Sequence, residues 1–191
     1  MIMPIVAYGH PVLRKKAENI DKNYPDLQQF IADMFETMYK SNGVGLAAPQ
    51  VNRSIRLFVI DATPYAEDFP GETNLKRVFI NPQIIEEKGE EWSFNEGCLS
   101  IPDIREDVIR KTELRLQYYD EDFNFHDEVI TGVMARVMQH EYDHLEGVLF
   151  VDRISPIRKI MLKRKLTDIS KGLVKTDYRM IFPLVKKQSK A

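Results

Sequence analysis

The sequence predicts an α+β fold in which mixed, mainly antiparallel strands pack around a central helix, followed by a C-terminal helix. Three stretches carry apolar residues at helical spacing, and short apolar strands lie between them without a βαβ alternation. The length of 191 residues suits one domain. We therefore expect a single domain over residues 1–177 and a basic C-terminal tail over residues 178–191.

The first half of the chain predicts one helix and two short buried strands. The helix begins near Pro25, which suits a first helical turn, and Asn42-Gly43 ends it. Its apolar positions at helical spacing are Leu27, Phe30, Ile31, Met34, Phe35 and Met38. Residues 57–60 and 78–80 are short apolar runs typical of buried strands. Between them, residues 61–76 contain prolines and acids and predict an exposed loop.

The second half predicts a strand and two helices. Residues 114–119 alternate between apolar and other side chains, which indicates a half-buried strand. The central helix is expected from about Glu128 to Leu145, ended by Gly147. The C-terminal helix starts at Ser155-Pro156, a cap followed by a first-turn proline. Its predicted apolar stripe comprises Ile157, Ile160, Met161, Ile169 and Leu173.

Composition and charge limit the class of protein. No apolar run reaches the length of a membrane span, and the N-terminus lacks the basic and long apolar regions of a secretory signal. The single cysteine, Cys98, allows no internal disulfide, which favours the reducing cytoplasm. From Arg153 onward lie 12 of the 27 Lys and Arg residues but only 2 of the 29 Asp and Glu residues. This basic region fits either contact with a polyanion or an ordinary solvated surface.

The strongest chemical signal is the segment His140-Glu141-Tyr142-Asp143-His144. Side chains four residues apart project from the same face of a helix, so both imidazoles can bind one metal ion. Glu141 lies between them, where it can handle the proton of a water activated by the metal. The chain has only four histidines, so two at this spacing around a glutamate argue against an incidental polar surface.

A catalytic site of this kind needs a third protein ligand and one open position. Two known zinc-enzyme patterns do not supply it, because Phe150 stands where a third histidine would, and no glutamate follows Glu146. Cys98 is the preferred candidate, since thiolate is a strong ligand for Zn²⁺ and Fe²⁺. The sequence leaves four other ligands open: His10, His126, Asp152 and Asp168.

Three segments together carry a resemblance to a known family. They are Gly-Val-Gly-Leu-Ala-Ala-Pro-Gln (43–50), Glu-Gly-Cys-Leu-Ser (96–100) and Gln-His-Glu-Tyr-Asp-His-Leu-Glu-Gly (139–147). In this order they resemble the three signature motifs of the peptide deformylases. The resemblance extends from Pro11 to the helix after Ser155, and no catalytic position departs from the family pattern.

The resemblance implies metal-dependent hydrolysis of the N-terminal formyl group from N-formylmethionyl nascent polypeptides, with release of formate. The metal ligands that it implies are Cys98, His140 and His144. The family's metal is usually Fe²⁺, and Zn²⁺, Ni²⁺ or Co²⁺ can substitute. Glu141 is then the general acid and base, while the Gln50 side-chain amide and the Leu99 backbone N–H stabilise the oxyanion.

The same resemblance implies where the substrate lies. We expect the peptide to add as a strand beside other strands, because backbone hydrogen bonds tolerate any sequence. The residues expected along the peptide are Val44, Gly45, Gly97 and Arg105. The residues expected around the methionine side chain are Val44, Val133, Arg136 and Val137. Family members often have an apolar residue where Arg136 stands, which leaves the direction of its side chain open.

Two other functions stay open from the residues. One is a zinc endopeptidase, and the other is a catalytically inactive metal-binding module, although a structural zinc site needs a fourth protein ligand that is not evident here. The C-terminal helix of some family members docks on the ribosome, and no membrane or DNA partner is expected. The basic residues expected at such a contact are Arg158, Lys159, Lys163, Arg164 and Lys165.

Overall fold

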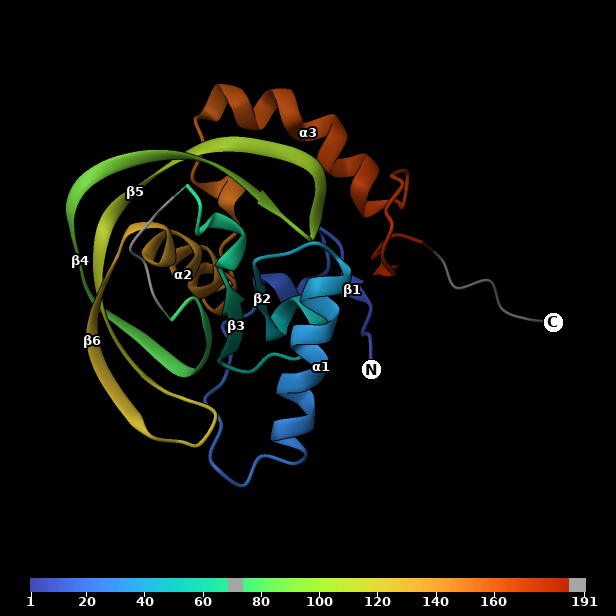
Figure 1. Cartoon of the computed structure of the whole chain (residues 1–191). Coiled ribbons are helices and arrows are strands. Elements are labelled where there is room, and N and C mark those ends of the chain that lie inside the picture. Colours follow the sequence, from blue (N-terminus) through green and yellow to red (C-terminus); the bar gives the residue numbers. More distant parts are fainter. Residues whose placement is uncertain (69–73, 186–191) are drawn as a thin grey trace.

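The computed structural model describes residues 1–68 and 74–185, and it confirms the α+β fold. Five strands form one antiparallel sheet in the order β2-β3-β4-β5-β6. Their bounds are β2 Gly45–Ala47, β3 Leu57–Asp61, β4 Lys76–Cys98, β5 Ile101–Tyr119 and β6 Phe125–Thr131. The long strands of this sheet curve around helix α2 (Gly132–Leu145), which therefore occupies the centre of the domain (Figure 1).

The hairpin of β4 and β5 is far longer than the sequence pattern predicts. The strands have 23 and 19 residues, whereas apolar runs and alternation indicated only residues 78–80 and 114–119. The missed part of β4 is largely exposed and acidic, so it carries no apolar signal, and pairing with β5 supplies its backbone hydrogen bonds. Residues 69–73 of the expected loop over 61–76 lie outside the described residues.

The predicted start of the central helix near Glu128 was wrong. Residues Phe125–Thr131 form β6, which pairs with β5 from Glu113 to Tyr119, and the helix begins only at Gly132. The side chains of β6 alternate between exposed and partly buried, which is a strand pattern. Nearly all of α2 is buried, because sheet and loops surround it, so this helix lacks the polar face of a surface helix.

Helix α1 (Leu27–Lys40) begins close to the expected Pro25 and packs against β2 and β3. A second sheet consists of two short parallel strands, β1 (Ile5–Val6) and β7 (Met180–Ile181), which join the two ends of the described chain. The remaining elements are 3₁₀ turns: η1 Pro11–Arg14, η2 Ala48–Val51, η3 Thr63–Tyr65 and η4 Phe150–Asp152.

Helix α3 (Pro156–Ser170) starts at the expected cap, where the Ser155 side chain accepts a hydrogen bond from the Arg158 backbone N–H. The helix lies outside the β4–β5 hairpin, on the side away from α2 (Figure 1). Its predicted apolar stripe was wrong except at Ile169. The exposed members are Ile157, Ile160, Met161 and Leu173. Instead, Leu162, Leu166 and Ile169 pack into the core, because only this line of the helix faces the sheet. Within the described residues, no helix has the length and apolarity of a membrane span.

Candidate active site and metal centre

Two histidines of α2 and the last residue of β4 meet at one point. Cys98, His140 and His144 each offer a ligand atom, and these atoms lie within 4.8 Å of one another. The Cys98 Sγ lies 3.3 Å from His144 Nε2. Ligand atoms of a tetrahedral metal site lie roughly 3–4 Å apart, given metal–ligand distances of about 2.0–2.3 Å. The donor set and its spacing therefore fit one divalent metal ion with an open fourth position.

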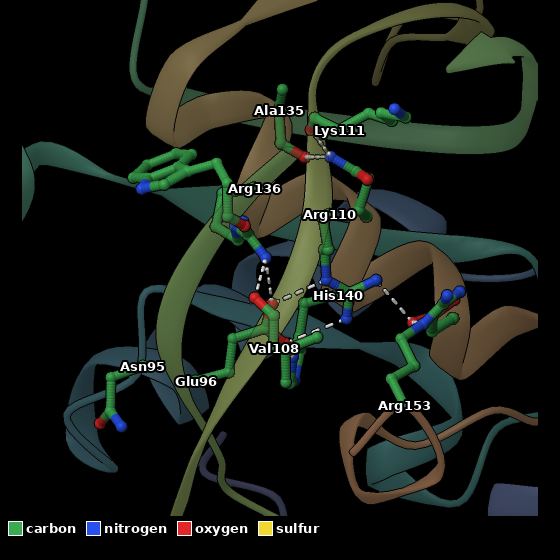
Figure 2. A network of polar contacts seen from close by, with 12 residues as sticks. Asn95, Glu96, Val108, Arg110, Lys111, Ala135, Arg136, His140 and Arg153 are labelled. Atoms are coloured by element: carbon green, nitrogen blue, oxygen red, sulfur yellow. Dashed lines mark hydrogen bonds and ion pairs between the residues drawn. The ribbon is translucent and has the colours of Figure 1, made fainter. Parts of the chain in front are cut away.

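A buried carboxylate orients one of these histidines. Glu96 Oε2 lies 2.9 Å from His140 Nδ1, so the other ring nitrogen of His140 is free to face the metal. Burial opposes the charge of Glu96, but hydrogen bonds from His140 and Arg110 outweigh it and hold the pKa of that carboxyl well below its usual range. Figure 2 shows this carboxylate enclosed by His140, Arg110 and Arg136.

The surroundings shift the pKa values of the two histidines in opposite directions. Burial disfavours a charged His140, yet hydrogen bonds to Cys98 and Glu96 raise its pKa. A metal ligand must be a neutral imidazole, so a metal ion competes with a proton at His140. Burial and the neighbouring His140 lower the pKa of His144, which favours the neutral imidazole that binds metals.

Glu141 is a buried acid on the same helix. Its side chain is 4% exposed, and its Oε2 has no hydrogen-bond partner among the described residues. Burial raises the pKa of Glu141 to about 7. It lines the cleft directly under Gly45, where a Cβ would lie 2.4 Å from Glu141 Oε1. A carboxyl with this pKa, beside a candidate metal centre, can take up and return a proton near neutral pH.

The Gln50 amide approaches the candidate ligand Cys98 from the turn η2. Its Oε1 accepts a hydrogen bond from the Ala47 backbone N–H at 2.8 Å, which leaves the Nε2 donor turned the other way. That Nε2 lies 3.4 Å from Cys98 Sγ and 3.3 Å from Ser100 Oγ. Gln50 is held by the turn η2, whose residues are all buried, so its donor has a fixed direction.

Gln50, Cys98, His140 and Glu141 line a cleft of about 490 Å³. Six of the seven residues expected at the substrate line it: Val44, Gly45, Gly97, Arg105, Arg136 and Val137. The seventh, Val133, is fully buried in the core cluster around α2. The Arg136 guanidinium lies over the Trp92 ring and donates a hydrogen bond to Glu96. Arg136 therefore lines the cleft with a positive charge that the Glu96 carboxylate balances.

The other ligands that the sequence left open lie in different places. His10 caps η1, His126 pairs with Asp120, and Asp152 pairs with Arg14. Asp168 is a residue of α3, outside the hairpin. Across residues 1–68 and 74–185, Cys98, His140 and His144 form the single cluster of three metal-binding side chains.

Asp143, inside the segment 140–144, is buried and accepts hydrogen bonds from Arg110 and Arg153. Sequence reasoning missed other residues around this site. The role of Glu96 depends on the register of β4 and β5, which no local pattern reveals. Residues 175–178 line the cleft from beyond all three motifs. The sequence could have drawn attention to Glu96, because it is an acid directly before Gly97 and the candidate ligand Cys98, but it could not have identified its partner.

Comparison with known proteins gives close relatives over nearly the whole length. The sequence model of the family described as polypeptide deformylase matches residues 2–160. A peptide deformylase of Christiangramia forsetii is 53% identical over 194 residues, covering 98% of this chain and 99% of that protein. The peptide deformylase of Flavobacterium johnsoniae is 55% identical with the same coverage.

Solved structures of similar fold carry the same description. A peptide deformylase from Plasmodium falciparum matches with a TM-score of 0.79 and 36% identity, covering 88% of this chain and 95% of that one. A peptide deformylase from Thermotoga maritima matches with a TM-score of 0.73 and 42% identity, covering 82% and 99%. At these identities the likeness covers sequence as well as fold.

Proposed function

The chain belongs to the polypeptide deformylase family, and we propose that Cys98, His140 and His144 hold the metal of its active site. It is accordingly a metal-dependent hydrolase that removes the N-terminal formyl group of nascent polypeptides. The proposed roles of individual residues depend on one observation: the Cys98 thiol and the imidazoles of His140 and His144 lie close together, beside the buried Glu141. A bound divalent metal supplies a Lewis acid that lowers the pKa of a water and polarises the formyl oxygen.

The chain's own residues move the protons. Glu141 takes a proton from the attacking water while the water oxygen bonds to the formyl carbon. Glu141 then gives that proton to the amide nitrogen as the carbon–nitrogen bond breaks. The products are formate and a free α-amine. The pKa of about 7 supports both halves of this role, because neither protonation state is strongly favoured at neutral pH.

Two donors stabilise the charge that develops on the formyl oxygen. The Gln50 Nε2 already points at Cys98, and the Leu99 backbone N–H follows the ligand in the chain. A fixed donor lowers the barrier because it needs no reorganisation during the reaction, and loss of one typically costs about 10²–10³ in rate.

The substrate peptide would extend the sheet. β2 is an edge strand of the five-stranded sheet, so its outer side is open to a further strand. Val44 and Gly45 lie at this edge, and Gly97 and Arg105 line the same cleft. The methionine side chain would lie against Val137 and Arg136. The ion pair of Arg136 with Glu96 reduces the free-energy cost of burying the guanidinium beside it.

We propose Fe²⁺ as the native metal, with Zn²⁺, Ni²⁺ or Co²⁺ able to replace it. One thiolate and two imidazoles suit both iron and zinc, and the choice of iron rests on the family resemblance. Air should inactivate an iron enzyme through oxidation of the metal or of the Cys98 thiolate, whereas the Ni²⁺-loaded protein should stay active. Full activity of an aerobic preparation that contains only zinc would contradict this choice.

We also propose that the enzyme works in the cytoplasm and contacts the ribosome through α3. In the described structure Arg158 pairs with Glu106, and Lys159 donates to the Asp152 carbonyl oxygen. No described acid pairs with Lys163, Arg164 or Lys165, so these three cations are available to a polyanion such as ribosomal RNA. Exposed Ile157, Ile160 and Met161 lie on the same helix.

Charge reversal tests the ribosome contact. A triple variant, Lys163→Glu, Arg164→Glu and Lys165→Glu, should lose ribosome co-sedimentation and keep activity on a short formyl peptide. Co-sedimentation of the wild type should also weaken steeply with salt. Binding that the triple variant retains, or no binding by the wild type at low salt, would contradict the proposal. Truncation is unsuitable because residues 175–178 line the cleft.

The reaction itself is tested with two peptides under anaerobic conditions. Formyl-Met-Ala-Ser should yield formate and free Met-Ala-Ser. A longer peptide without a formyl group, protected at both ends, should remain intact. Internal cleavage of the protected peptide would indicate an endopeptidase, and a metal-loaded protein inert toward both would indicate a binding module.

A further inference from the structure

The turn between β4 and β5 carries two groups of the proposed reaction in adjacent residues. Cys98 ends β4 and pairs with Ile101, so Leu99 and Ser100 make the two-residue connection. The strand register shifts between Gly97 and Cys98, which interrupts regular pairing just before the proposed ligand. Ladder hydrogen bonds alone therefore do not fix the direction of the Leu99 N–H.

Both carbonyl groups of this turn accept hydrogen bonds from distant parts of the chain. The Tyr178 hydroxyl donates to the Leu99 carbonyl oxygen at 2.8 Å. The Tyr8 backbone N–H donates to the Ser100 carbonyl oxygen, also at 2.8 Å. The Leu99 side chain packs into the same apolar cluster as the Tyr178 ring, so hydroxyl and ring hold the turn together.

The small parallel sheet places these two donors. Tyr8 follows β1 by two residues, and Tyr178 precedes β7 by two residues. Ile5 pairs with Met180 and Val6 with Ile181, and both β1 residues are fully buried. Strand pairing thus fixes one donor relative to the other, which explains why two ends of the chain meet beside the cleft.

The segment that carries Tyr178 belongs to the cleft. Residues 175–178 line it together with Gly43 and Val44, although the family match ends at residue 160. Burial raises the pKa of the Tyr178 hydroxyl, so the group keeps its proton and stays a donor at any working pH. The reaction proposed above gives this hydroxyl no role.

We propose that Tyr178 is a positioning residue: its hydroxyl holds the Leu99–Ser100 peptide group, and this fixes the backbone of Leu99 so that the Leu99 N–H, in the preceding peptide group, points at the reacting oxygen. The inference rests on the proposed deformylase function and extends it to a residue outside the three motifs. Tyr178 acts through Leu99, because its hydroxyl is engaged with the Leu99 carbonyl group. The effect should appear mainly in kcat, since the oxyanion exists only beyond the ground state.

The substitution Tyr178→Phe keeps the ring and removes the hydroxyl. For formyl-Met-Ala-Ser we expect kcat to fall about three- to tenfold, the range that one hydrogen bond of ordinary strength supplies. KM should change by less than about twofold, and one metal per chain should be retained. Hydrogen exchange of the Leu99 amide, followed by NMR, should become faster even in the metal-free protein, because the turn is less constrained.

Tyr118→Phe is the matched control. Its hydroxyl is also buried and donates to Glu128 at 2.6 Å, but Tyr118 does not line the cleft. This control should leave kcat and Leu99 exchange unchanged. Wild-type kcat and wild-type exchange in Tyr178→Phe would overturn the inference, and so would a change in KM alone. Failure of the wild type to release formate would instead refute the proposed function.

Discussion

At the scale of single residues, Glu141 shows how the site trades stability for chemistry. Burial of a carboxyl that has one oxygen, Oε2, without a hydrogen-bond partner costs free energy, and the raised pKa of Glu141 reflects that burial. Glu96, equally buried, is compensated by Arg110, Arg136 and His140 and keeps its charge. Two acids on facing elements thus have opposite properties: one stays ionised and orients a ligand, while the other can exchange a proton.

Glu141→Gln should abolish turnover without removing the metal. The amide has nearly the same shape but cannot accept and return a proton, so kcat should fall by about 10²–10⁴. Metal content should stay at one ion per chain, because Glu141 is not among the three clustered side chains. Formate release and metal analysis on the same sample measure both. A variant with a tenth of wild-type activity would remove Glu141 from the role of acid and base.

The sequence could identify the site residues that local spacing brings together. His140 and His144 share a helix face by their spacing alone, and Cys98 stood out by its chemistry and its neighbours. Glu96 could not be linked to His140, because 44 residues separate them and their contact depends on how β4 passes α2. Tyr178 gave no signal, since it is one of eight tyrosines and lies outside the three motif segments.

At the scale of elements, β2 links the substrate to the acid. Its Gly45 faces Glu141 so closely that no side chain fits between them. The backbone of β2 can then approach both the peptide and the helix α2. The glycine at position 45 is therefore explained by the lack of space for a side chain and not by a need for conformational freedom.

Gly45→Ala should impair both stability and turnover. The new Cβ would lie 2.4 Å from Glu141 Oε1, so the strand or the carboxyl must move. Overpacking of this kind costs about 1–3 kcal/mol. Urea unfolding of the variant should show that loss, and kcat should fall because Glu141 is displaced. Wild-type stability together with wild-type kcat would mean that the contact between β2 and α2 adjusts freely.

Elements were predictable where one face is apolar and the pattern is regular. Helix α1 fits this description, and its start was placed within two residues. The second half of strand β6, from Glu128, was assigned to the helix because its short, mixed sequence runs directly into α2 without a turn. For helix α3 the pattern indicated the wrong face. The face with the most apolar residues is exposed to solvent, and the face with Leu162, Leu166 and Ile169 is buried by tertiary contacts.

At the scale of the whole molecule, several acids outside the cleft stabilise the fold as ions. Burial opposes their charges, but hydrogen bonds and ion pairs lower the pKa values of Glu128, Glu146 and Asp152 and bring the pKa of Asp120 to about 2. Their partners join separate elements; for example, Glu146 binds Arg56 and Lys16.

Stability should therefore fall in acid. A carboxyl with a folded pKa below its unfolded value of about 3.9–4.3 stabilises the fold above that pH, and the stabilisation disappears as the pH drops through the folded pKa. Melting temperatures of the metal-free protein should decrease between about pH 4.5 and 2.5. The opposite effect of Glu141, whose folded pKa is about 7, acts mainly between about pH 7 and its unfolded pKa of about 4.3, so it is largely complete within this window. Glu146→Gln should flatten the curve, and a curve that is level in both proteins would contradict this account.

The most direct measurement of the central claim is the metal content and formate release of Cys98→Ser beside the wild type. A hydroxyl is a far poorer ligand than thiolate, so the variant should lose most of its bound metal after dialysis and nearly all release of formate from formyl-Met-Ala-Ser. The wild type, prepared anaerobically, should keep one metal ion per chain and release formate. One metal per chain and wild-type turnover in Cys98→Ser would contradict the metal centre proposed for this chain.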